Sequence, residues 1–354
     1  MNKLLVLFIF NFFIFGCGKG LSDSDSSGKV RFSEPETIID TLAYVPVNYA
    51  QFDDGSFVVG DYLSHSVFKF DSSGKLKAKT GGQGSGPGEY GIFSAFSVKD
   101  SLIFIADIIN RRITVLEDNL NLKNSFIPEN RYVFNMNFAG NSLYALGRTL
   151  IPETSGSRYI VDEYKKEGRH YKFYRHLLRI DELPEFIDKN EPGTIRSVKV
   201  GDKIYIFCNY SSYVYILDAL TNKITEKEIM FPGYISPFNI SAKKLNKKYE
   251  SETGMQNFAF SNIFYWTVLD VFRLKETNDF LVNYTIPWQL RSKYDNKKML
   301  LCVFDENFSY KASLTHNLRI LNADLVKGEI ELIATDPEAE DEIFSIIKNK
   351  LILN

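Results

Sequence analysis

The chain has 354 residues, of which 44% are hydrophobic and 14% aromatic, so it is long enough to bury a large core. Its formal net charge of −2 excludes the strongly basic composition with which proteins attract nucleic acid, and we expect no nucleic-acid partner. The three cysteines and four histidines are scattered and show no zinc-ligand spacing.

The N-terminus indicates export. Lys3 precedes an apolar run from Leu4 to Phe15, which is too short to span a bilayer and is typical of a signal peptide. The run ends in Ile14-Phe15-Gly16-Cys17, which resembles a bacterial lipobox, although Phe15 is bulkier than the usual residue there. The resemblance implies that residues 1–16 are removed and that Cys17 receives lipid.

Residues 17–29 are rich in serine, glycine and aspartate, which predicts a flexible tether between the lipid and a folded body at 30–354. We therefore expect a lipid-anchored protein of the bacterial cell envelope, on the periplasmic face or the cell surface, whose membrane contact is the N-terminal lipid. The alternative is an ordinary secretory signal with an incidental cysteine.

The folded body begins with a strand-like segment, 37–45, and then contains the same pattern twice. Residues 53–61 return as 99–107, a shift of about 46 positions, and the match continues through the next apolar run. A repeat of this length, built of apolar runs and turns, is the signature of a propeller blade. We expect the unmatched N-terminal strand to close the ring by completing the blade that the C-terminus supplies.

Two motifs in this repeat carry a family resemblance. Residues 106–116 read Ala-Asp-Ile-Ile-Asn-Arg-Arg-Ile-Thr-Val-Leu, which resembles the NHL repeat, whose core is roughly Ala-Asp-x-x-Asn-x-Arg-Ile-x-x-Phe. The joint 84–90, Gly-Ser-Gly-Pro-Gly-Glu-Tyr, is similar to that of NHL-like six-bladed propeller lipoproteins of the Bacteroidetes type. The clear resemblance covers residues 50–120, with Ser64 and Ser66 replacing Asn and Arg in the first copy, and it implies an all-β, six-bladed β-propeller.

Beyond these two copies the residues of the repeat no longer match, and only the alternation of apolar runs and turns continues. It predicts blades at 47–80, 92–127, 131–180, 194–230, 258–315 and 317–354. The third blade contains a basic and aromatic elaboration, 148–190. That elaboration is interpreted either as a site for a glycan or polyanion or as a solvated outer strand pair.

Two polar motifs have a structural interpretation. Residues 86–91 formally satisfy Gly-x-Gly-x-x-Gly, but Pro87 lies inside the motif and a strand follows it, so we interpret it as an inter-blade turn rather than a dinucleotide site. In the repeat family the positions of Asp107, Asn110 and Arg112 mostly tie a strand turn to its neighbour through side-chain hydrogen bonds.

Metal and thiol chemistry are weakly indicated. Propeller enzymes of the gluconolactonase-like and strictosidine-synthase-like types hold a metal at the channel mouth, which needs several converging oxygen ligands. Residues of a suitable type are Glu89, Asn137, Asn209, Asn283 and Asp324, and nothing in the sequence brings them together. We expect no cofactor, with Ca²⁺ as the exception to be tested, and we interpret Cys208 and Cys302 as buried thiols without a disulfide.

A pocket, if the ring has one, is expected at the channel mouth, because large polar and aromatic side chains on loops commonly supply ligand contacts. The candidate ligand-binding residues are Arg111, Arg148, Tyr210, Trp288 and Arg291. The leading hypothesis is a monomeric, non-enzymatic module that binds a small molecule, glycan, peptide or envelope protein. The alternatives are a metal-dependent hydrolase or lyase of the lactonase type, and a purely scaffolding envelope protein.

Overall fold

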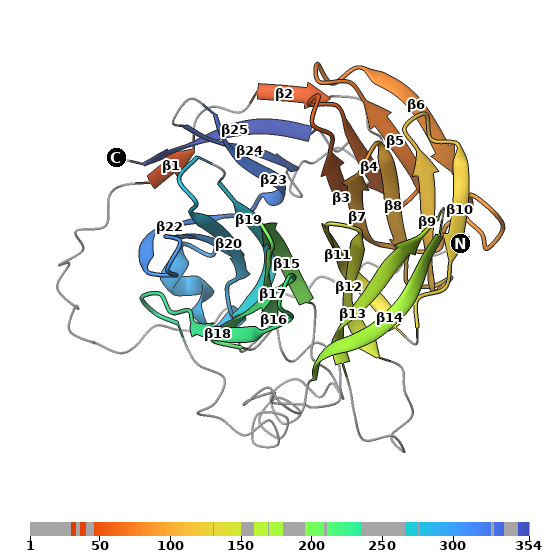
Figure 1. Ribbon diagram of the computed structural model, residues 1–354. Helices are drawn as coiled ribbons and strands as arrows, with labels where there is room; N and C mark the ends of the chain where they lie inside the picture. Colours follow the sequence, from red (N-terminus) through yellow and green to blue (C-terminus); the bar gives the residue numbers. More distant parts are fainter. Residues whose placement is uncertain are drawn as a thin grey trace, which may run out of the picture.

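The computed structural model describes residues 30–32, 36–39, 46–129, 131–149, 159–168, 170–179, 195–208, 211–234, 266–274, 276–326, 329–335 and 346–353. These residues form six antiparallel sheets arranged around a central axis, as Figure 1 shows. The chain is therefore the all-β, six-bladed propeller that the sequence predicts.

Each of the first three blades contains four strands in sequential order. Blade one consists of β3 (Pro46–Gln51), β4 (Phe57–Asp61), β5 (Ser66–Phe70) and β6 (Leu76–Gly81). Blade two consists of β7 (Phe93–Lys99), β8 (Leu102–Asp107), β9 (Arg112–Glu117) and β10 (Leu122–Phe126). Blade three consists of β11 (Arg131–Ala139), β12 (Ser142–Thr149), β13 (Tyr159–Glu167) and β14 (His170–Arg179).

The other three blades repeat this order, and the last one has a fifth strand. Blade four consists of β15 (Ile195–Val200), β16 (Lys203–Cys208), β17 (Tyr213–Asp218) and β18 (Ile224–Glu228). Blade five consists of β19 (Thr267–Arg273), β20 (Phe280–Thr285), β21 (Met299–Phe304) and β22 (Tyr310–His316), with the 3₁₀ segment η4 (Trp288–Tyr294) between β20 and β21. Blade six contains β23 (Arg319–Val326), β24 (Glu329–Thr335) and β25 (Ile346–Leu353), to which β1 (Val30–Phe32) and β2 (Glu36–Ile39) are added.

The ring is closed by N-terminal strands, as predicted. Both β1 and β2 pair antiparallel with β25, so the start of the folded body completes the blade made by the end of the chain. The predicted closing strand, 37–45, overlaps β2, and residues 40–45 lie outside the described residues. The sequence analysis missed β1, whose three residues are too few to show a period. Closure pairs an edge strand that an open ring would expose.

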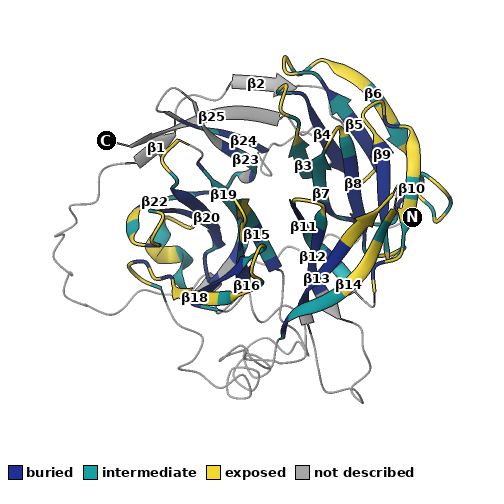
Figure 2. Cartoon of the chain, in the orientation of Figure 1, coloured by how far each residue is buried: buried dark blue, intermediate teal, exposed yellow. Residues whose placement is uncertain are grey.

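The hydrophobic core lies between the blades rather than within one centre. In the described part of the chain, each pair of neighbouring blades shares its own cluster of buried apolar side chains. Between blades four and five, for example, Phe207 and Val214 pack with Phe280 and Phe304. Figure 2 shows the consequence: middle strands such as β4 and β8 are buried, and exposed residues gather on the outer strands β6, β10 and β18.

The basic and aromatic elaboration of blade three forms the outer strands β13 and β14. Its charged side chains are mainly exposed; Lys172 pairs with Glu167 at 2.5 Å, and the Lys165 ammonium lies 3.4 Å from the centre of the Tyr174 ring. The interpretation as a solvated outer strand pair is confirmed for 159–168 and 170–179. The rest of the predicted elaboration from residue 150 onward lies outside the described residues.

Both cysteines of the folded body are free and fully buried, as expected. Cys208 lies in the cluster between blades three and four and Cys302 in the cluster between blades four and five. Burial raises the pKa of the Cys208 thiol to about 12, and it also raises that of Cys302, because a thiolate is poorly solvated in an apolar interior.

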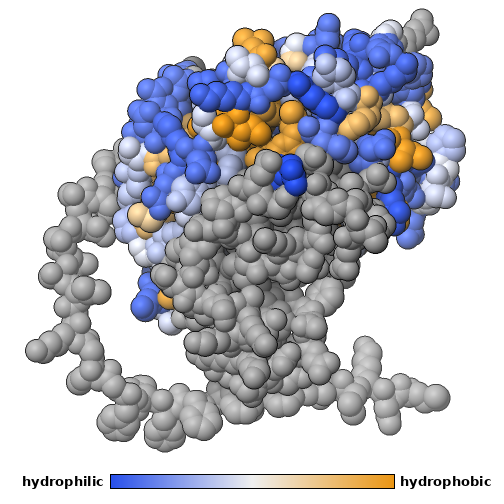
Figure 3. Space-filling model, turned by 60° about the horizontal axis from the view of Figure 1, so that its bottom comes forward, coloured by the Kyte–Doolittle hydropathy of each residue, from blue (hydrophilic) through white to orange (hydrophobic). Residues whose placement is uncertain are grey.

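The most exposed large apolar side chains of the described surface come from blades one, two and four: Leu63, Ile109, Ile127, Leu220 and Met230. On the face shown in Figure 3, hydrophobic areas are set among hydrophilic surface. None of the helical segments in the described ranges has the length and apolar character needed to cross a bilayer.

Candidate functional site

The repeated aspartate ties a turn to the neighbouring segment. Asp107 ends β8, is 2% exposed, and accepts hydrogen bonds from four backbone N–H groups, those of Gly91, Ile92, Ile109 and Asn110, at 2.8–3.2 Å. The Asn110 side chain adds a fifth at 2.7 Å. Asp61 of blade one similarly accepts from the Ser64 N–H at 2.8 Å.

Arg112 fixes the glycine-rich joint between blades one and two. Its guanidinium donates to the carbonyl oxygens of Ser85 and Gly86, each at 2.9 Å, and to that of Glu89. The Glu89 carboxylate in turn accepts from the Gly86 N–H at 2.8 Å. The structural interpretation of these motifs is therefore confirmed, and residues 86–91 form an inter-blade turn rather than a dinucleotide site.

The central channel is lined by the first strand of each blade: β3, β7, β11, β15, β19 and β23. Five of these six strands carry a register shift near their start, where one extra residue interrupts the ladder. The extra residues are Val47, Ser94, Phe134, Leu269 and Leu321. A β-bulge turns side chains away from the regular pleat. The five bulges therefore form a ring at one end of the channel.

A cavity of about 400 Å³ lies at this level, and all six inner strands contribute to it. Its volume is within the range of small-molecule sites. The polar residues that line it are Asn48, Ser94, Asn135, Arg196, Asp270 and Asn283, and the aromatic ones are Tyr49, Phe96, Phe134 and Phe272.

An ion pair along this lining joins blades four and five. Arg196 Nε lies 3.6 Å from Asp270 Oδ1, and the two side chains are 24% and 34% exposed. Arg196 also donates to the carbonyl oxygens of Leu269 and, at 3.4 Å, Ile195. A guanidinium has five N–H donors. Several donors of Arg196 therefore have no partner among the described residues and can bind a ligand.

Amide side chains of the channel wall are held in place by neighbouring blades. Asn135 Oδ1 accepts from the Met136 N–H at 2.7 Å, and its Nδ2 lies 3.4 Å from the Ser197 carbonyl of blade four. The Ser94 hydroxyl lies 2.6 Å from the Val133 carbonyl of blade three. These contacts orient polar groups before any ligand binds, which lowers the entropic cost of binding.

A buried histidine positions one of the amides. Asn283 is fully buried in β20, and its Oδ1 lies 3.0 Å from Nε2 of His316, which is 3% exposed. Burial lowers the pKa of His316 to about 4, so its imidazole is neutral at physiological pH. A neutral imidazole that donates from Nε2 fixes the orientation of the Asn283 amide at the cavity wall.

The comparison with known proteins places this architecture in a family. Residues 45–287 match a family described as "6-bladed beta-propeller", which is more than half of the chain. The chain belongs to that family. No curated protein matches it significantly.

Two crystal structures are similar over nearly their whole length. A candidate exported protein from Bacteroides fragilis has 15% sequence identity and a TM-score of 0.62, and the match covers 94% of this chain and 98% of that one. A member of the DUF4221 family from Bacteroides vulgatus has 8% identity and a TM-score of 0.62, with 92% and 99% covered. At sequence identities of 8% and 15%, this structural similarity shows a shared fold and no more.

Four of the five ligand-binding residues predicted from sequence, Arg111, Arg148, Trp288 and Arg291, belong to the same end of the propeller as the cavity. Each lies in, or just before, the connection between the second and third strands of a blade, which is where the bulged inner strands begin. Arg111 is exposed in the β8–β9 turn with its guanidinium 5.7 Å from the centre of the Tyr132 ring. Arg148 occupies the β12 position opposite Tyr132.

The remaining predicted residues are in blades four and five. Trp288 and Arg291 belong to η4, and Tyr210 lies outside the described residues. Neither Arg111 nor Arg291 is among the residues that line the cavity. Their role in binding stays a prediction.

The candidate metal ligands have other partners where the structure describes them. Asn137 donates to the Ser197 hydroxyl at 2.6 Å, Glu89 caps the inter-blade turn, and Asn283 contacts His316. Asn209 lies outside the described residues, as does the side chain of Asp324. Among the described residues, no three His, Cys, Asp or Glu side chains gather as a metal site would require.

Apart from Asn283, the sequence analysis missed the polar channel residues because bulge positions have no signature in a single sequence. Asn48, Asn135 and Asp270 each follow a bulge residue, and in the sequence they are ordinary polar residues near the start of an apolar run. The sequence signal that could have found these three polar residues is that they occupy the same position in their blades. It appears only when the blades are aligned strand by strand.

Proposed function

We propose that the protein is an exported, lipid-anchored module of the bacterial cell envelope that binds a short glycan in its central channel. The observation that carries the proposal is the cavity of about 400 Å³ at the bulged end of the ring. It combines oriented hydrogen-bonding groups with aromatic side chains in one cavity.

This combination fits the chemistry of a sugar. Hydroxyl groups both donate and accept, so they match amides, a carboxylate and a guanidinium, which Asn48, Asn135, Asp270 and Arg196 supply. The C–H faces of a pyranose ring are apolar and can pack on an aromatic ring such as Phe134. A purely apolar ligand would leave the Arg196–Asp270 pair desolvated and is disfavoured.

Export and anchoring rest on the N-terminus. A signal-peptide pattern ends at Gly16, the lipobox-like Cys17 follows, and a polar tether precedes the ring. One structural relative is described as a candidate exported protein. A single acyl chain binds membranes only marginally, so a stable anchor requires more than one chain on Cys17.

The anchor is tested by expressing the full chain in a bacterium fed radiolabelled palmitate. The wild type is expected in the membrane fraction with label, whereas Cys17→Ser is expected to lose both. Label-free, soluble wild-type protein would reduce the N-terminus to an ordinary secretory signal.

Ligand binding is tested by calorimetric titration of the chain from residue 17 onward, carrying Cys17→Ser, with mono- and oligosaccharides. Asp270→Asn and Arg196→Gln are each expected to weaken binding by about tenfold or more, as loss of a polar contact in an enclosed site does. Lys172→Gln on the exposed strand β14 is the matched control and should bind like wild type. A glycan that binds wild type and both channel variants equally would place the site elsewhere.

The alternatives have distinct outcomes in the same experiment. A stoichiometric metal in the purified protein, or stabilisation by Ca²⁺ that EDTA reverses, would point to the metal-dependent hydrolase. Binding of extended peptides instead of sugars would keep the channel as the site and change the ligand class.

A further inference from the structure

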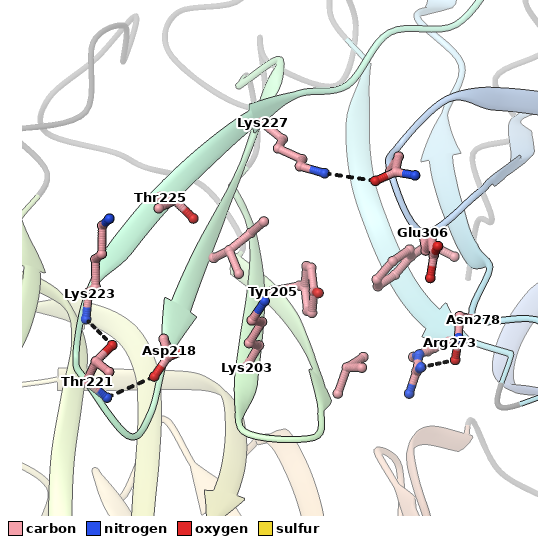
Figure 4. A pocket seen from close by; sticks show the side chains of 14 residues that line it. Lys203, Tyr205, Asp218, Thr221, Lys223, Thr225, Lys227, Arg273, Asn278 and Glu306 are labelled. Atoms are coloured by element: carbon pink, nitrogen blue, oxygen red, sulfur yellow. Dashed lines mark hydrogen bonds between the residues drawn. The ribbon is translucent and has the colours of Figure 1, made fainter.

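A second cavity lies away from the channel, between the outer parts of blades four and five. It also measures about 400 Å³ and opens to solvent along strand β18 (Figure 4). Its floor is apolar and aromatic: Val200, Tyr205 and Ile216 come from blade four, and Phe280 from blade five. The Tyr205 and Phe280 rings lie 4.9 Å apart, so the floor continues across the two blades. We call this cavity the outer groove.

The wall of the outer groove is cationic because of strand alternation. Lys223, Thr225 and Lys227 are two positions apart and line the groove, whereas Glu226 and Glu228 fall at the intervening positions and do not. The strand thus directs its lysines to the groove and its glutamates to the other face. From Lys223 to Lys227 the wall is about 13 Å long at about 3.3 Å per residue.

Two more cations complete the wall. Lys203 lies at the start of β16, and Arg273 ends β19 on the opposite blade, so the positive charges face each other across the groove. Arg273 donates to Asn278 Oδ1 through Nη2, and its buried Nε–H has no partner among the described residues. None of the four cations forms an ion pair with another described residue; Lys227 only approaches Asn307 Oδ1, at 3.4 Å.

The two carboxylates at the groove do not neutralise it. Asp218 Oδ1 accepts from the N–H groups of Thr221 at 2.8 Å and Leu220 at 3.0 Å. Those bonds, first of all the one from Thr221, lower the pKa of Asp218, and the Lys203 charge contributes least. The lowered pKa keeps Asp218 ionised. Glu306 is exposed in the β21–β22 turn, so four cations stand against two carboxylates and the groove keeps a positive net charge.

We propose that the outer groove binds an amphipathic organic anion: a carboxylate or phosphate head between Arg273 and the lysines, with an aromatic or aliphatic body on the floor formed by Tyr205 and Phe280. A guanidinium pairs with either head group through two parallel hydrogen bonds. The body covers the apolar surface that Val200 and Tyr205, both partly exposed, present to water in the groove. This site is independent of the channel and of the glycan proposal.

The test is calorimetric titration of the chain from residue 17 onward, carrying Cys17→Ser, with 1-naphthyl phosphate and 1-naphthoate. Their neutral and body-free analogues, 1-naphthol and inorganic phosphate, are the comparison. At least one naphthyl anion is expected to bind about tenfold or more tightly than both analogues, and the stronger of the two identifies the preferred head group. Its affinity should fall as salt is raised, because the wall is open to solvent.

Substitutions assign the binding to the groove. Arg273→Gln and Lys203→Gln are each expected to weaken binding by about fivefold or more, with Arg273→Lys retaining part of it. Lys123→Gln, on the exposed outer strand β10 of blade two, is the matched control and should leave binding unchanged. Circular dichroism establishes that each variant is folded. Equal binding of 1-naphthol, or unchanged binding by all three groove variants, would overturn the proposal.

Discussion

The most direct test of the blade architecture is removal of the Asp107 carboxylate. Asp107→Ala deletes one acceptor group that serves five donors: four backbone N–H groups and the amide of Asn110. Two of those backbone groups, of Gly91 and Ile92, belong to the joint that enters blade two. The other two belong to the β8–β9 turn, so the substitution loosens both segments together.

The size of the effect follows from burial. Asp107 is 2% exposed, so its donors cannot all turn to water. A buried donor without an acceptor costs about 1–3 kcal/mol. If water takes the place of the Asp107 carboxylate for some donors, most of the five lost hydrogen bonds still cost about 1 kcal/mol each. We therefore expect the free energy of unfolding to fall by roughly 4 kcal/mol. Asp107→Asn keeps one acceptor oxygen and is expected to lose about half as much.

The assay is urea unfolding followed by tryptophan fluorescence and circular dichroism. The matched control is Asp71→Ala, because Asp71 accepts from the Ser73 and Lys75 N–H groups in the same way but in an exposed turn. We expect a clearly smaller loss for Asp71→Ala than for Asp107→Ala. If the two substitutions cost the same, burial of the repeated aspartate is not what makes it important, and the reasoning fails.

Three further predictions concern buried groups. His316 has its pKa lowered to about 4 and stays neutral in the folded protein, whereas the same histidine in the unfolded chain gains a proton below about pH 6.5, so its contribution to stability is complete above that pH and falls on acidification. In urea unfolding, His316→Gln should therefore reduce the difference in unfolding free energy between pH 7 and pH 5 by about 2 kcal/mol. Cys208 and Cys302 should react with a disulfide reagent only after unfolding, because burial raises both thiol pKa values; fast labelling of native protein would contradict their placement. Gly147→Ala would bring a Cβ within 2.0 Å of the Tyr132 carbonyl oxygen, so blade three should be destabilised by several kcal/mol; a thermal midpoint equal to that of wild type would refute this.

The fold was predictable because its determinants are local and repeated. Turn residues such as Asp53 and Asp54 are matched about 46 residues later by Lys99 and Asp100, and the apolar runs between the turns have the length of strands. Six blade positions could therefore be derived even where residue identity had decayed. The short strand β1 could not be, because three residues show no period and its pairing with β25 joins the two ends of the chain.

The sequence predicted only which end of the ring holds the candidate site, and not the residues that line it. Arg111 and Arg291 were chosen because they lie on connections, and the structure places those connections at the end where the bulges are. The channel residues Asn48, Asn135 and Asp270 depend instead on where the ladder shifts register. A register shift results from the pairing of two strands, so no single strand's sequence reveals it.

β15 is the inner strand that pairs without a register shift among the described residues, and it carries the arginine of the charged pair in the channel. In four bulged strands the extra residue follows a buried apolar side chain, as Phe134 follows Val133. Blade four pairs without a register shift, and Arg196 follows the buried Ile195 in the same way. The Arg196 guanidinium reaches the next blade, where it contacts the Leu269 carbonyl and Asp270. The bulge of blade five presents those two groups to it, so the charged pair arises from one regular and one bulged strand side by side. A ligand that replaces part of this pair's hydration must offer both donors and acceptors, which is why the channel suits a polyhydroxylated molecule better than an apolar one.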